Sequence, residues 1–139
     1  MHLLSNMLFL WVFGDNVEDS MGHSRFISFY LICGILATLT HAVAESDSNL
    51  PLIGASGAIS GVLGAYIVLF PRAKILALLM NIIPIRLPAV LVIGVWIAIQ
   101  FLNLNNDDGT AWWAHVGGFI SGVVLIFLFK RPDPIPLKN

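Results

Sequence analysis

Five mainly apolar stretches, separated by short polar ones, divide this chain of 139 residues. The last four are each close to the ~20 residues that a helix needs to cross the ~30 Å hydrocarbon core of a bilayer. The first is too short to span by itself. We expect helices throughout, because every backbone amide left unpaired in lipid costs several kcal/mol. The pattern predicts helical spans over about residues 2–14, 26–43, 52–70, 87–104 and 111–129.

The composition agrees with a membrane location. Hydrophobic residues make up 58% of the chain, charged residues only 11%, and the mean hydropathy is +0.87. Soluble domains carry about 25% charged residues. The net charge of −1 and the absence of a basic run argue against nucleic acid as a partner. Cys33 is the single cysteine, so an internal disulfide is excluded. The sequence therefore predicts an all-α, polytopic helical bundle in a lipid bilayer.

The charged residues of the loops predict the orientation. All seven Lys and Arg residues fall in loops on one side, whereas loops 45–50 and 105–109 on the other side carry only acidic charges. By the positive-inside rule the basic side, with the C-terminus, is cytoplasmic. We expect this to be the plasma (inner) membrane of a prokaryote.

One membrane domain, residues 1–131, and a short cytoplasmic tail, residues 132–139, account for the whole chain. Residues 75–85 are apolar but few, and Asn81 and Pro84 interrupt them. We therefore predict an interfacial segment there and not a sixth span.

Two small-residue motifs carry the candidate chemistry. Gly54-Ala55-Ser56-Gly57 begins the third span, and Ala114-His115-Val116-Gly117-Gly118 begins the fifth. In the predicted topology both enter the membrane from its outer face at comparable depth. A free serine hydroxyl is a weak nucleophile, so Ser56 needs a base. The neutral imidazole of His115 can accept the serine proton and later donate it to a leaving amine.

Glycines at four-residue spacing provide a way for these two helices to meet. Gly57 and Gly61, with Gly64 one turn further on, lie in the third span, and Gly118 and Gly122 lie in the fifth. Small residues at this spacing let helix backbones approach closely in lipid.

Two polar residues of the first segment are candidates for stabilising a developing oxyanion. His2 and Asn6 are four residues apart and so share one face of a helix. Their side chains, together with the backbone amide of Ser56, could supply the preorganised donors that an attacked carbonyl needs.

Each sign also has a plainer interpretation. A G-x-S-G motif in a spanning helix is commonly a packing motif. Asn6 could simply form a hydrogen bond to a neighbouring helix. Gln100 and Asn103 in the fourth span could do the same, or they could face a water-filled cavity. The shared depth of serine, histidine and the polar pair favours catalysis.

Taken together, the motifs resemble those of the rhomboid intramembrane serine proteases. They are H-x-x-x-N at 2–6, G-x-S-G at 54–57 and A-H-x-G-G at 114–118, and residues 13–18 resemble the end of the family's second helix. The resemblance implies a rhomboid-like fold, with Ser56 as nucleophile, His115 as general base, and His2 and Asn6 in the oxyanion hole. It implies membrane-spanning protein substrates cut near the outer end of their helix, without metal or cofactor.

The pattern differs from the family's in two respects. The family has six core helices, and this chain has five of them, so we expect an N-terminally truncated chain that lacks the first helix and first outer loop. Some relatives carry an aromatic ring four residues after the nucleophile, where this chain has Ser60. The sequence thus predicts an intramembrane serine endopeptidase; the alternative is a catalytically inactive rhomboid-like binding or chaperone protein.

Overall fold

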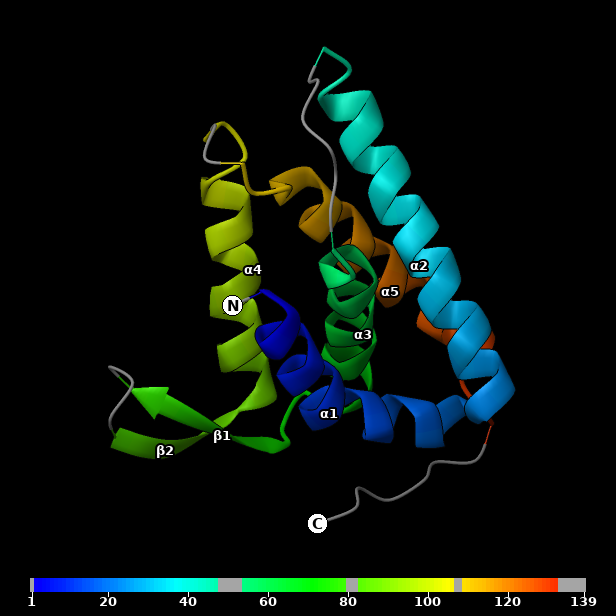
Figure 1. Ribbon diagram of the computed structural model, residues 1–139. Helices are drawn as coiled ribbons and strands as arrows, with labels where there is room; N and C mark the ends of the chain where they lie inside the picture. The colour runs from blue at the N-terminus through cyan, green and yellow to red at the C-terminus, as the bar shows by residue number, and fades with distance from the viewer. Residues whose placement is uncertain (1, 48–53, 80–82, 107–108, 133–139) are drawn as a thin grey trace.

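The computed structural model describes residues 2–47, 54–79, 83–106 and 109–132 (Figure 1). Within these ranges, five helices account for most of the chain, and the predicted helical bundle is confirmed. The predicted cytoplasmic tail, residues 132–139, lies outside the described residues from 133 onward. The elements are α1 (His2–Met21), α2 (His23–Ala44), α3 (Ser56–Leu69), β1 (Lys74–Leu79), β2 (Ile83–Pro88), α4 (Ala89–Leu102) and α5 (Trp112–Phe129).

Helices α2 to α5 run alternately up and down in Figure 1, and α1 lies across the lower part of the bundle. The end of α2, the start of α3, the end of α4 and the start of α5 are the upper ends of their helices. The junction of α1 with α2, the strand pair and the end of α5 lie at the lower end. Ser56 and His115 therefore enter the bundle from the same end, as the predicted topology requires.

Helix α1 is longer than the apolar stretch predicts. We expected it to end near residue 14, but it continues to Met21. The apolar run ends at Phe13 because the following turns carry both polar and apolar residues. The helix continues through these turns, since backbone hydrogen bonding does not require apolar side chains. Val17 and Met21 are buried in the core between the acidic residues of these turns.

The core of the bundle lies where α2, α3 and α5 pack against one another. Helix α3 is buried along nearly its whole length and packs most extensively against α5. Large side chains fill the lower part of this core, where the ring of Phe29 contacts that of Phe129 edge to face at 5.7 Å. Phe13 of α1 meets Tyr66 of α3 in the same way at 5.0 Å. Helix α4 lies at the edge of the bundle.

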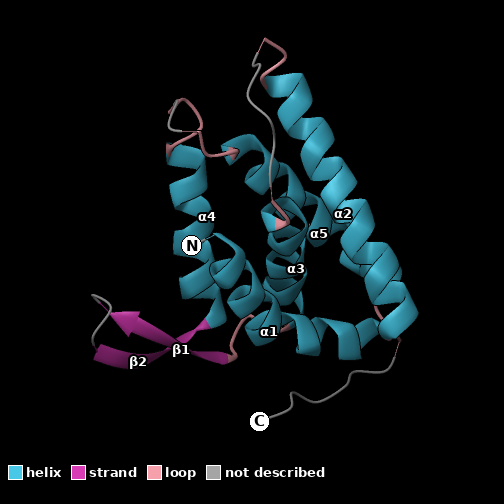
Figure 2. Cartoon of the chain, in the orientation of Figure 1, coloured by secondary structure: helices cyan, strands magenta, loops and turns pink. Residues whose placement is uncertain are grey.

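The segment predicted to be interfacial forms an antiparallel strand pair (Figure 2). Strand β1 pairs with β2 in a register that joins Lys74 to Pro88 and Leu79 to Ile83. Alternating side chains face opposite sides of such a pair, and Ile75 points into the core whereas Leu76 is exposed. The backbone amide of Ala89 donates to the carbonyl of Ala73 at 2.8 Å, which closes the base of the pair.

Two of the described helices, α2 and α5, are long and apolar enough to cross a bilayer. Helices α3 and α4 are shorter and also apolar. Many large apolar side chains on the outer faces are exposed, among them Leu31, Leu102 and Leu128. So many exposed large apolar side chains are unusual for a protein in water.

Candidate active site

Ser56 and His115 meet at the upper end of the bundle. Ser56 is the first residue of α3, and His115 lies in the first turn of α5. The His115 Nε2 atom is 2.9 Å from the Ser56 Oγ atom, within hydrogen-bond distance. Two residues separated by 59 positions in sequence thus form one polar pair, half-buried at the start of two adjacent helices.

Glycines at the crossing of α3 and α5 allow this contact. A Cβ atom on Gly118 would overlap the carbonyl oxygen of Gly57, and one on Gly122 would overlap the carbonyl of Gly61. Gly64 lies similarly close to the backbone of Phe119. The two backbones therefore touch directly, with no side chain between them.

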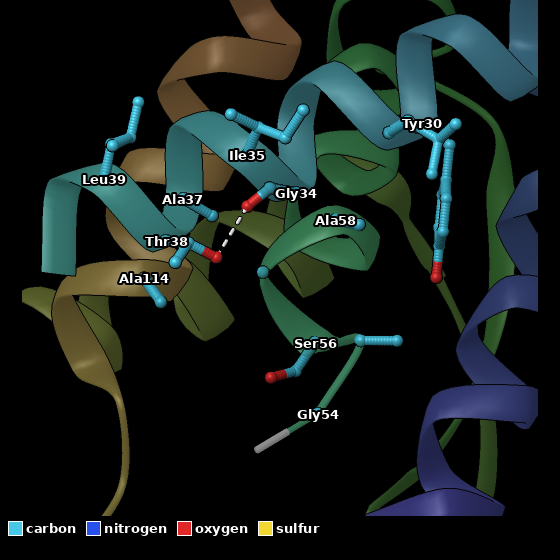
Figure 3. Close-up of a pocket in the computed structure, with 13 residues that line it drawn as sticks. Tyr30, Gly34, Ile35, Ala37, Thr38, Leu39, Gly54, Ser56, Ala58 and Ala114 are labelled. Atoms are coloured by element: carbon cyan, nitrogen blue, oxygen red, sulfur yellow. Dashed lines mark hydrogen bonds between the residues drawn. The ribbon is translucent and has the colours of Figure 1, made fainter. Parts of the chain in front are cut away.

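The backbone ahead of Ser56 has a conformation that favours glycine. Gly54 has a φ of 130°, which L-residues rarely adopt. The chain turns there and enters α3, so that the Ser56 side chain projects from the helix start (Figure 3). The first amides of a helix have no partner within it, and this end carries partial positive charge. Ser56 therefore lies where a developing negative charge is favoured.

Ser60, at the position where some rhomboids have an aromatic ring, forms a hydrogen bond within its own helix. It is buried, and its hydroxyl donates to the carbonyl oxygen of Ser56 at 2.7 Å. The ring of His115 instead contacts two tryptophans. Its centroid is 5.9 Å from that of Trp96 in a tilted arrangement and 6.2 Å from that of Trp112, edge to face.

Gln100 of α4 occupies the other side of the His115 ring. Its Oε1 atom is 2.7 Å from His115 Nδ1, and its Nε2 atom donates to the Trp96 carbonyl at 3.0 Å. Sequence reasoning expected Gln100 to bond a neighbouring helix or face a wet cavity, and it bonds a neighbouring helix. Neither Gln100 nor the two tryptophans was predicted as a site residue. The one available signal was a polar amide inside an otherwise apolar helix.

A cleft of about 410 Å³ opens beside Ser56, between α2 and α3 (Figure 3). Its wall near the serine consists of small residues, and bulkier side chains of α2 line the rest. The hydroxyl of Thr38, one of the lining residues, donates to the Gly34 carbonyl of its own helix at 3.0 Å. The lining residues are Tyr30, Leu31, Gly34, Ile35, Ala37, Thr38, Leu39, Gly54, Ala55, Ser56, Gly57, Ala58 and Ala114.

The predicted oxyanion residues lie in α1, which packs against α2 and α3. Asn6 is half-buried, and no hydrogen bond between described residues joins it to Ser56 or His115. The side chain of His2 lies outside the described part of the structure. Their role therefore stays a prediction. In the described ranges, no group of three or more His, Cys, Asp or Glu residues is placed to hold a metal ion.

Comparison with known proteins gives matches over most of the chain. The family model of the Rhomboid domain matches residues 1–132, which confirms the resemblance seen in the motifs. Rhomboid protein 1, mitochondrial, of Saccharomyces cerevisiae is 36% identical over 134 residues, covering 88% of this chain and 36% of that protein. Rhomboid protease GluP of Bacillus subtilis is 36% identical over 123 residues, covering 87% of this chain and 22% of that protein.

RHOMBOID-like protein 5 of Arabidopsis thaliana is 30% identical over 134 residues, covering 96% of this chain and 41% of that protein. The chain thus spans well under half the length of these curated relatives. No solved structure matches the chain significantly. Several relatives are mitochondrial, which does not fit the prokaryotic plasma membrane that we expected.

Proposed function

Because the chain belongs to the rhomboid family, we propose that it is a membrane-embedded serine endopeptidase. Ser56 is the nucleophile and His115 the general base and acid. The observation that carries the proposal is the 2.9 Å contact between Ser56 Oγ and His115 Nε2. This contact joins the serine of the G-x-S-G motif, the candidate nucleophile, to the histidine of the A-H-x-G-G motif, the candidate base.

The family and the apolar helices make the chain an integral membrane protein. Its proposed substrates are proteins with a membrane-spanning helix, cut near the outer end of that helix. The proposed orientation puts the strand pair and the C-terminal side in the cytoplasm. The described basic residues lie in the first turn of α2 (Arg25), in and next to the strand pair (Arg72, Lys74 and Arg86) and directly after α5 (Lys130 and Arg131), and these elements are at that end.

In the proposed reaction, Ser56 Oγ attacks the carbonyl carbon of the scissile peptide bond while His115 Nε2 takes the hydroxyl proton. The tetrahedral intermediate collapses as the protonated imidazole donates that proton to the leaving amine. Water, activated by the same nitrogen, then releases the acyl group from the serine. Among the described residues, His115 Nδ1 contacts the amide of Gln100 and not a carboxylate, so the proposed chemistry is that of a dyad.

The oxyanion of the intermediate needs donors in a site of low dielectric constant. The Ser56 amide is one, since the first amides of α3 have no acceptor within the helix. Asn6 and His2 of α1 are the proposed side-chain donors. One such donor typically contributes about 10²–10³ in rate in other serine proteases, so we expect losses of that order on removing Asn6.

A substrate helix must partly unwind before its peptide bond can reach Ser56, because helical carbonyls are hydrogen-bonded. Substrates with glycine or other helix-breaking residues near the outer end unwind most easily, since glycine costs a helix about 1 kcal/mol relative to alanine. The small residues Gly34, Ala37 and Ala58 beside Ser56 leave room for an extended segment in the cleft.

The test is cleavage of a reporter membrane protein by Ser56→Ala and His115→Ala variants, with Ser121→Ala as matched control. Ser121 is also a serine in a spanning helix, but its hydroxyl donates to the carbonyl of Gly117 in the same helix. We expect both dyad variants to lose cleavage while retaining their fold, and the control to cleave normally. Continued cleavage by either dyad variant contradicts the assignment. Binding of the reporter without cleavage by the unaltered protein identifies the inactive, chaperone-like alternative.

A further inference from the structure

The amide of Gln100 is buried inside an apolar helix, and both of its ends are hydrogen-bonded. The residue is only 4% exposed. A buried amide without partners would cost several kcal/mol. Here Nε2 donates to the Trp96 carbonyl at 3.0 Å, and Oε1 lies 2.7 Å from His115 Nδ1. The amide thus links α4 to His115, the member of the candidate dyad on α5.

The chemistry of these partners determines which nitrogen of His115 carries the proton. A backbone carbonyl only accepts, so the Trp96 carbonyl must face the NH₂ group of Gln100. Turning the amide over would set two oxygens against each other. The Gln100 oxygen therefore faces His115, and since an amide oxygen also only accepts, His115 Nδ1 must carry a hydrogen.

A neutral imidazole has only one N–H group. With that hydrogen on Nδ1, the lone pair of Nε2 points at the Ser56 hydroxyl 2.9 Å away. In the other tautomer, Nε2 would donate towards the hydroxyl and could not take its proton. Trp96 and Trp112 hold the same ring from two further directions, which limits its rotation.

We propose that Gln100 is a positioning residue that holds His115 in the Nδ1–H tautomer, with Nε2 facing Ser56. The inference rests on the proposed function. In serine proteases of the Ser-His-Asp type, a carboxylate orients the histidine and also stabilises its charged form. The neutral amide oxygen of Gln100 orients His115 in the same way. Because it carries no charge, it does not stabilise the charged form of the histidine as a carboxylate would.

Three variants of α4 separate positioning from packing. Gln100→Met keeps the length of the side chain and removes both hydrogen bonds. Gln100→Glu keeps an oxygen that accepts from Nδ1–H in either protonation state. Asn103→Leu is the matched control, since Asn103 Nδ2 donates to the Ile99 carbonyl at 2.7 Å, four residues back as in Gln100, but touches no dyad residue.

We expect Gln100→Met to lower kcat about 10- to 100-fold, the scale of a small misplacement of a reacting group, with KM changed less than about twofold. Gln100→Glu recovers most of this loss, and Asn103→Leu cleaves like the unaltered protein. If Gln100→Met does not fold, Gln100→Asn, whose amide is one methylene too short to reach His115, takes its place.

Nitrogen-15 NMR of labelled histidine provides a readout that a purely structural role would not change. At a pH where the ring is neutral, we expect His115 to give a protonated Nδ1 and an unprotonated Nε2 signal. The Asn103→Leu variant keeps this pattern, and Gln100→Met shifts both signals towards the average of the two tautomers. The signals are assigned by their loss in His115→Ala.

Two results overturn the inference. One is an unchanged tautomer in Gln100→Met, whatever its activity. The other is a shifted tautomer with full kcat. Failure of the proposed function is distinct, because it appears as continued cleavage by Ser56→Ala, whereas the NMR pattern does not depend on cleavage.

Discussion

Gly122→Ala tests the close crossing of α3 and α5 that brings Ser56 to His115. A Cβ atom built on Gly122 would lie 2.7 Å from the Gly61 Cα, and closer still to the Gly61 carbonyl, where ordinary contact begins at 3.4 Å. The atoms that it meets are backbone, so no side-chain rotation relieves the clash. The helices must therefore move apart by more than the few tenths of an ångström that a tight contact can absorb.

Forcing an extra methyl group into a close-packed contact costs about 1–3 kcal/mol. Alanine's better helix propensity offsets up to about 1 kcal/mol of this. We therefore expect Gly122→Ala to destabilise the protein by about 1–2 kcal/mol. Gly94→Ala in α4 is the matched control, because a Cβ on Gly94 meets nothing within 4 Å. It gains the same propensity without the clash and is expected to be neutral or slightly stabilising.

The assay uses the single cysteine of the chain. Cys33 is completely buried, so a thiol-reactive dye labels it only when the bundle opens. Labelling during a thermal ramp gives the unfolding midpoint, which we expect to fall by on the order of 5 °C in Gly122→Ala and not in Gly94→Ala. Equal midpoints for the two variants would refute the reasoning from backbone contact.

Three further predictions follow from other parts of the fold. Gly54→Ala forces an L-residue to a φ of 130° and should lower the stability by about 1–3 kcal/mol, which the same thermal ramp measures. It should also lower the rate of cleavage in the reporter assay. Phe13→Ala removes a buried ring that packs on α3 and should cost about 3–5 kcal/mol in a denaturant titration, whereas Trp11→Ala, at 74% exposed, should cost far less. Cys33 should stay unlabelled by thiol reagents in the folded protein at room temperature, and rapid labelling there would contradict its burial.

The helical bundle and the pairing of Ser56 with His115 could be anticipated because both depend on local patterns. Apolar runs identify spanning helices, and small-residue motifs mark the ends at which two of them begin. Where a helix ends is harder to predict from hydropathy. Helix α1 passes beyond its apolar run to Met21, since hydrogen bonding continues through polar residues.

Two features could not be predicted from the sequence, each for a physical reason. The strand pair β1–β2 forms from segments too short and too evenly apolar to reveal a period. The contact of Gln100 with His115 depends on how α4 is rotated about its axis. Apart from Gln100 itself, that helix is apolar on all sides, so its sequence does not indicate which neighbouring helix the face that carries Gln100 turns towards.

Labelling with a fluorophosphonate probe, located by mass spectrometry, tests the proposed dyad most directly. Such probes react with serines whose hydroxyl is activated by a base. We predict an adduct on Ser56 in the unaltered protein, no adduct in Ser56→Ala, and strongly reduced labelling in His115→Ala. An unaltered, folded protein without an adduct on Ser56, or equal labelling with and without the His115 imidazole, would contradict the account.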